Sequence, residues 1–103
     1  MSELPKTFKK FTDDYPDIAK GYEAMGTAVH AAGPLDEKTR ALIKLAVSVG
    51  ARMEGAVHSH TRKALDADCT AEEIKQTVLL SLPTTGLPNM MASMTWVNDI
   101  LEK

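Results

Sequence analysis

The sequence predicts an all-helical fold, and two observations support this prediction. Proline and glycine residues divide the chain into segments of helical length, and no stretch of five or more residues alternates between polar and apolar in the manner of a strand. A chain of 103 residues has the size of one domain. We therefore expect a single domain over residues 1–103, built from about six helices.

The net charge of the chain limits its expected binding partners, and its cysteine content limits its expected cellular compartment. Twelve basic and fourteen acidic residues leave a net charge of −2, which gives no attraction to nucleic acid or to an anionic membrane. The single cysteine cannot form an internal disulfide, and "MSELPKTFKKF" lacks the apolar core of a secretory signal, so we expect a cytoplasmic protein. The apolar runs are far shorter than the ~20 residues that cross a bilayer. A domain of this size buries only a limited apolar area, so apolar surface that stays exposed to water is costly to its stability. Self-association is therefore expected.

The first third of the chain is expected to hold two helices. A short amphipathic helix at about residues 4–12 precedes "DDYP", in which Pro16 suits the first turn of a second helix that runs to about Ala32. Gly33 ends that helix. Asp36 is then the expected N-cap of a third helix, because its carboxylate can accept a hydrogen bond from a free amide of the first turn.

The third helix is apolar around most of its circumference, and only a narrow strip of Glu37, Lys44 and Ser48 is polar. Such a helix belongs in the middle of the fold or in a contact between subunits. Its apolar residues are Leu42, Ile43, Leu45, Ala46, Val47 and Val49.

Local sequence patterns also predict where the later helices begin and end. The fourth begins after Gly50 and Ala51 and ends near Asp68, which suits a left-handed backbone. Thr70 and Glu73 form a capping box that starts a fifth helix, whose apolar run stops at Pro83. After the break "PTTGLPN", methionines at helical spacing indicate adaptable core. The buried face of this last helix is expected to be Leu87, Met90, Met91, Met94, Val97 and Leu101.

The fourth helix carries two histidines on different sides. At about 100° per residue, His60 lies on an apolar side, whereas His58 is about 200° away from it. The two imidazoles therefore cannot bind one metal ion from an intact helix, and we expect no metal site. The apolar stripe is Met53, Ala56, Val57, His60 and Ala64, and the polar stripe is Glu54, His58 and Arg62.

Each polar residue in this part of the chain has a structural and a functional interpretation. His60 is either a core histidine bonded to a carbonyl or hydroxyl, or a group that exchanges protons near neutrality; burial would lower its pKa and a carboxylate would raise it. Glu54 and His58, four residues apart, suit an exposed ion pair. Arg40 either forms an ion pair at the start of its helix or holds a carboxylate through its bidentate fork. Cys69, beside Asp68 and without a second cysteine, does not fit a redox centre.

The order of these segments resembles the carboxymuconolactone decarboxylase and alkylhydroperoxidase D-like (AhpD-like) superfamily. The resemblance rests on "PLDEKTRALIKLAVSVGAR", "MEGAVHSHTRKALDADCTAEEI" and "LLSLPTTGLPNMMAS", roughly residues 34 to 94. It implies an AhpD-like helical bundle that assembles as a homotrimer or homohexamer.

The peroxidase branch of this superfamily carries a Cys-x-x-Cys-x-x-x-His sequence on the histidine helix. The two cysteine positions fall on Met53 and Ala56, the histidine on His60, and the glutamate that precedes them falls on Ala41. The nucleophile, the resolving thiol and the proton relay are all replaced. Peroxidase or antioxidant activity by that mechanism is therefore disfavoured.

The decarboxylase branch lacks the cysteine pair and keeps the histidine, with an acidic residue near the position of Glu54. Resemblance to it implies a lyase that needs no cofactor, in which a group such as His60 gives a proton to carbon as carbon dioxide leaves a small carboxylated lactone. The candidate catalytic residues are His60 and Glu54, and the candidate substrate-binding residues are Arg40 and His58. The alternative is a non-catalytic member that serves as an oligomeric binding or scaffold protein.

Overall fold

The computed structural model describes residues 5–103 and is entirely helical where it is regular. Over this range the chain has six helices of nine residues or more and one of four residues. The internal contacts divide the chain near residue 35 into two units, and each unit is described by itself. The all-helical prediction is confirmed.

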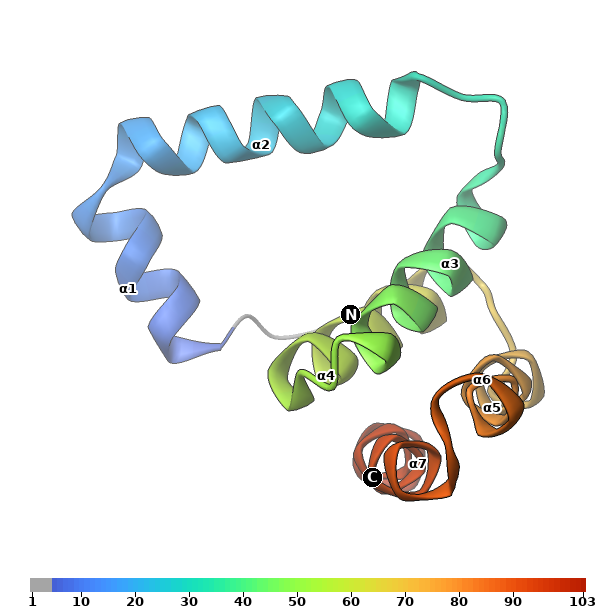
Figure 1. The fold of residues 1–103 in the computed structure, drawn as a ribbon. Helices are drawn as coiled ribbons and strands as arrows, with labels where there is room; N and C mark the ends of the chain where they lie inside the picture. Colours follow the sequence, from blue (N-terminus) through green and yellow to red (C-terminus); the bar gives the residue numbers. More distant parts are fainter. Residues whose placement is uncertain (1–4) are drawn as a thin grey trace. The chain divides into compact units, whose positions relative to one another are not determined.

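The N-terminal unit contains α1 (Lys6–Asp14) and α2 (Pro16–Ala31), which meet at Tyr15 (Figure 1). Pro16 occupies the first turn of α2, as predicted, because a proline there sacrifices no intrahelical hydrogen bond. The chain leaves α2 through Gly33, whose φ of 34° suits a residue without a side chain. The predicted start of the first helix at residue 4 lies outside the described residues.

The second unit begins with a helical hairpin of α3 (Glu37–Gly50) and α4 (Glu54–Asp66). The Asp36 carboxylate accepts a hydrogen bond of 2.8 Å from the backbone N–H of Thr39, which confirms the predicted N-cap. Residues 51–53 form the turn, where Arg52 has a φ of 58°. Because the turn is so short, α4 runs back along α3, and the two helices lie side by side (Figure 1).

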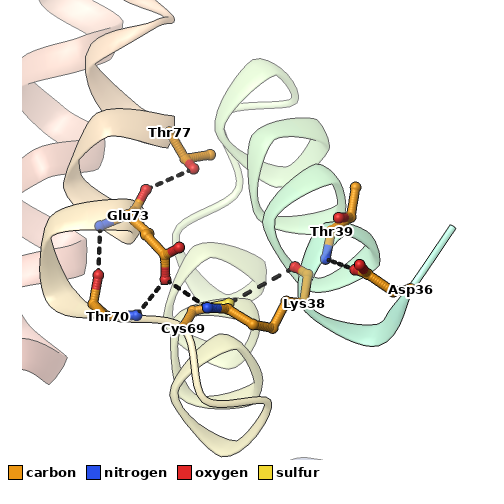
Figure 2. Close-up of polar contacts among 7 residues, drawn as sticks. All are labelled: Asp36, Lys38, Thr39, Cys69, Thr70, Glu73 and Thr77. Carbon is orange, nitrogen blue, oxygen red and sulfur yellow. Dashed lines mark hydrogen bonds and ion pairs between the residues drawn. The ribbon is translucent and has the colours of Figure 1, made fainter.

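The unit is completed by α5 (Ala71–Leu79), α6 (Leu82–Thr85) and α7 (Leu87–Leu101). Asp68 has the expected left-handed conformation, with a φ of 66°. Thr70 and Glu73 form the predicted capping box, with bonds of 3.0 and 2.8 Å (Figure 2). α5 ends at Leu79, before the predicted stop at Pro83, and Pro83 lies in the first turn of the four-residue helix α6, where proline is tolerated.

The core of the second unit lies where α3, α4, α5 and α7 meet. Asn89 belongs to it, and its amide nitrogen donates to the Val49 carbonyl at 3.1 Å and the Thr85 hydroxyl at 2.7 Å. On α7 the prediction was partly wrong: Leu87 and Met91 are 55% and 54% exposed. The buried apolar residues are Leu45, Val49, Val57, Ala64, Cys69, Ile74, Val78, Met90 and Val97, with Met94 and Leu101 packed against them.

Of the polar strip predicted for α3, only Glu37 is exposed. Ser48 is buried and its hydroxyl donates to the Lys44 carbonyl at 2.9 Å, so the helix itself satisfies the group and permits its burial. Lys44 is half-buried. The exposed side of α3 is instead apolar, with Val47 66% exposed and Ile43 44% exposed.

Candidate functional site

His60 lies on a flank of α4, beside the stripe that enters the core. That stripe is Val57, Thr61 and Ala64, and the Thr61 hydroxyl is satisfied by the Val57 carbonyl at 2.7 Å. His60 is half-buried at its edge. On the predicted inward stripe Val57 and Ala64 are buried and Ala56 and His60 are half-buried. Met53, also expected on it, is the N-cap of α4 and is 58% exposed.

The surroundings of His60 favour an uncharged imidazole. Its pKa is lowered to about 4 by burial first, and then by the positive charges of Lys63 and Lys44. The ring is therefore neutral at pH 7. Lys63 is one turn further along α4, and Lys44 comes from α3, so the site spans both arms of the hairpin.

His58 lies on the opposite flank of α4 and faces α7. Its Nε2 atom is 3.0 Å from an Asp99 carboxylate oxygen. The structure thus places an acidic partner from α7 beside His58, and not Glu54 from its own helix. Because the two imidazoles of "HSH" face different neighbours, they do not converge on one ligand, and residues 5–103 contain no group of three or more potential metal-binding side chains.

Glu54 is exposed at the first turn of α4. It precedes His60 by six residues, which corresponds to about 9 Å along the helix axis and places it on another side of the helix. One chain therefore does not bring the two candidate catalytic groups together. An acidic charge at this position also suits the positive end of the helix dipole.

Arg40 is half-buried in the first turns of α3. The Asp36 carboxyl has a lowered pKa, mainly because of its hydrogen bonds from Thr39, and the Arg40 charge adds to this effect. Arg40 also contributes to lowering the pKa of Lys44, one turn away, after burial and Lys63. Arg40 is thus close to both the start of α3 and Lys44.

Cys69 is buried between the starts of α3 and α5. Its Sγ atom is 3.7 Å from the Lys38 carbonyl oxygen, and the Lys38 ammonium is 3.2 Å from Glu73 (Figure 2). Burial, followed by the Glu73 charge, raises the pKa of the thiol. At neutral pH the sulfur is therefore protonated and poorly reactive.

Residues 16–99 match the sequence profile of the carboxymuconolactone decarboxylase family. The chain belongs to this family. Its similarity to an uncharacterised protein of Haemophilus influenzae (strain ATCC 51907 / DSM 11121 / KW20 / Rd) is 38% identity over 63 residues, which is 61% of this chain. The match spans 56% of that relative, so the chain covers little more than half of its length. The family assignment confirms the resemblance found in the sequence.

Sequence reasoning about this family member missed two lysines. The sequence showed that Arg40 and Lys44 share a helix face, because they are four residues apart. It showed the same for His60 and Lys63, which are three residues apart. That Lys44 approaches His60 depends on how α3 and α4 align in the hairpin. Asp99 was missed for the same reason, because it reaches His58 from α7.

Proposed function

We propose that this carboxymuconolactone decarboxylase family member carries out cofactor-free acid/base chemistry at His60 on a small carboxylated substrate. The observation that carries the proposal is the half-buried imidazole of His60, whose pKa is lowered by burial and then by the charges of Lys63 and Lys44, so that it is uncharged at pH 7. A partly desolvated imidazole exchanges protons with a small change of surroundings, and cations beside it suit a carboxylate. The proposal keeps the cytoplasmic location expected from the single unpaired cysteine.

The chemistry is decarboxylation of a lactone carboxylate. The bond between the ring carbon and the carboxylate breaks, its electron pair stays on carbon as a conjugated enolate, and carbon dioxide leaves. Protonated His60 then gives a proton to that carbon, and the imidazole regains a proton from water. Nearby positive charge stabilises the enolate oxygen. Peroxidase chemistry is disfavoured, because Met53 and Ala56 replace the two thiols and Cys69 is buried.

The rival function, an oligomeric scaffold or binding protein, is favoured by a different observation. Val47 and Leu80 are 66% and 62% exposed, near a cavity of about 220 Å³. Four hydroxyls line this cavity, and each donates to a carbonyl of its own chain, so the walls present mainly apolar surface. We propose that a second copy of the chain covers this surface in a homotrimer or homohexamer. The lining residues are Ala46, Val49, Gly50, Thr77, Leu80, Ser81, Thr84 and Thr85.

The two functions are separated by a panel of small lactone carboxylates assayed for release of carbon dioxide. We expect turnover that falls by about 100-fold or more in His60→Gln, the size of effect usual for loss of a general acid. His30→Gln, which changes the histidine of α2 in the N-terminal unit, is the matched control and retains most activity. If the assembled protein turns over none of the panel and no compound shifts the His60 ring signals, the scaffold function is supported instead.

A further inference from the structure

The apolar side chains of α2 form a narrow stripe that the N-terminal unit leaves uncovered. They recur at spacings of three, four, three and four residues, and at about 100° per residue they lie within an arc of about 80°. Although α1 packs against α2 in this unit, each side chain of the stripe is between 55% and 63% exposed. The residues of this α2 stripe are Tyr15, Ile18, Tyr22, Met25 and Val29.

The spacing within the α2 stripe is that of a helix that packs along another helix. Alternating steps of three and four repeat every seven residues, as the a and d positions of a coiled coil do, and such a seam is narrower than the face by which a helix packs on a globular core. The acidic and lysine side chains of α2 point elsewhere. Lys20 is on the side opposite to the stripe, and Asp17 and Glu23 are about 120° from its centre. A partner helix therefore meets the stripe without bringing these charges into the contact.

The residues beside the α2 stripe are small, which allows a second helix to come close. Two of them, Gly21 and Gly26, are in the interior of α2, where glycine is less favourable than alanine. Apart from the adjacent backbone, no heavy atom of residues 5–103 lies within 4 Å of a Cβ atom added to either glycine. Packing within the described chain thus does not require glycine at these positions, whereas the close approach of another helix explains it. The small residues on the two sides of the stripe are Ala19, Gly21, Gly26 and Ala28.

We propose that α2 pairs with α2 of a second copy of this chain, antiparallel and along the α2 stripe. A two-fold contact uses the same surface on both copies, and a second α2 supplies the matching apolar seam with small residues beside it. The antiparallel arrangement places the positive end of each helix dipole next to the negative end of the other. In the register centred between Tyr22 and Met25, Tyr22 lies opposite the partner's Met25, and Ile18 lies opposite the partner's Val29.

The area of this contact is large enough for a specific interface. Covering five side chains of this size, each more than half exposed, removes about 500 Å² of surface from each copy. The total of about 1,000 Å² reaches the size expected of a biological contact between proteins. The inference goes beyond the proposed function, because it places a contact on the N-terminal unit and depends neither on His60 nor on the exposed surface of α3 and α5.

The first test is sedimentation over a range of protein concentrations, with variants matched in pairs. Met25→Glu adds a carboxylate within the stripe and should raise the dissociation constant of the oligomer by at least about tenfold. Gly21→Leu adds bulk beside the stripe and should also weaken association, although leucine is the better helix former. Thr27→Glu and Thr27→Leu add the same side chains at an exposed position on the opposite side of α2 and should associate like wild type. Circular dichroism should show the same helix content in all four variants.

The second test is disulfide trapping, which reports the pairing and its direction. Copies that carry Ile18→Cys, mixed with copies that carry Val29→Cys and oxidised, should form a disulfide-linked dimer, whereas Ile18→Cys alone should not. Wild type is the control, because its thiol, Cys69, is buried.

Four outcomes would overturn the inference. These are a wild-type protein that stays monomeric, a stripe variant that associates like its Thr27 counterpart, a mixture that forms no linked dimer, and Ile18→Cys copies that link to each other. The turnover expected of His60 is measured separately in the lactone assay, so a failure of the proposed function leaves this inference intact, and the reverse also holds.

Discussion

His60 is a neutral group beside positive charges, and this changes the order of events expected for proton transfer. An imidazole with a pKa of about 4 is almost entirely unprotonated at pH 7, so it has no proton to give as a general acid. The general-acid role implied by the family thus requires that the pKa rise when substrate binds. The same low pKa links the stability of the free protein to pH.

The first prediction concerns this linkage. The ordinary pKa of His60 is 6.5, and folding lowers it to about 4. At a pH between these two values, His60 binds a proton in the unfolded chain but not in the folded protein. Its contribution to stability is therefore complete above pH 6.5 and is lost as the pH falls toward 4. Urea unfolding should show wild type losing more stability than His60→Gln from pH 6.5 to 5, a window above the carboxyl range. Parallel losses in both proteins would contradict the lowered pKa.

The second prediction concerns Cys69. Because the thiol is buried and its pKa is raised, it should react with Ellman's reagent at least about tenfold more slowly in the native protein than in the urea-unfolded chain. Cys69→Ser should keep whatever activity the wild-type protein shows. Thiol-dependent consumption of hydroperoxide by wild type but not by Cys69→Ser would show that the sulfur is catalytic after all.

At the level of the helices, the sequence predicted those features that depend on a few neighbouring residues. The Asp36 cap, the capping box of Thr70 and Glu73, and the turns at Gly33 and Asp68 are set by hydrogen bonds and backbone preferences within one or two turns.

Features that depend on packing between helices could not be predicted in this way. Ser48 is buried because it faces another helix and bonds to its own carbonyl. Lys44 approaches His60, and Asp99 approaches His58, because of the alignment between separate helices. Their positions are not encoded in the periodicity of either helix alone. The four site residues named from the sequence thus remain predictions, and the structure adds the neighbours.

The third prediction tests the start of α5. Thr70→Ala removes the hydroxyl that accepts a hydrogen bond from the Glu73 N–H and should lower the free energy of unfolding by about 1 kcal/mol. Thr95→Ala is the control, because Thr95 is exposed within α7 and its hydroxyl bonds only to the carbonyl one turn back. Alanine is the better helix former there, so that variant should be neutral or slightly stabilised. Urea unfolding followed by circular dichroism measures both, and equal effects would contradict a capping role.

The fourth prediction tests the link between α7 and α3. Asn89→Ala leaves the carbonyl of Val49 without this buried donor and should destabilise the protein by about 2 kcal/mol in urea unfolding. Asn98→Ala, on the same helix and only half-buried, provides the comparison and should cost less. A smaller effect for Asn89 than for Asn98 would show that the bond to Val49 contributes little.

On the scale of the whole molecule, each unit leaves apolar side chains uncovered. On α2 and its N-cap Tyr15 these recur at spacings of three and four, and they are Tyr15, Ile18, Tyr22, Met25 and Val29. On the second unit they include Val47, Leu80 and Met91. A helix with such a stripe needs a partner surface. None of the helices within residues 5–103 is long and apolar enough to cross a membrane. Self-association remains our proposal for covering these residues.

The last prediction follows from that proposal. If Val47 is buried between copies, Val47→Glu places an unpaired carboxylate in an apolar contact, which is costly. The variant should raise the dissociation constant of the oligomer by at least about tenfold, equivalent to about 1.4 kcal/mol, and sediment as a smaller species than wild type. Gln76→Glu adds the same charge at an exposed polar position of α5 and should assemble normally. Because Val47 is already exposed in the single chain, the helix content of Val47→Glu should not change. A wild-type protein that sediments as a monomer, or a Val47→Glu variant that assembles like Gln76→Glu, would show that this face of α3 is not the contact.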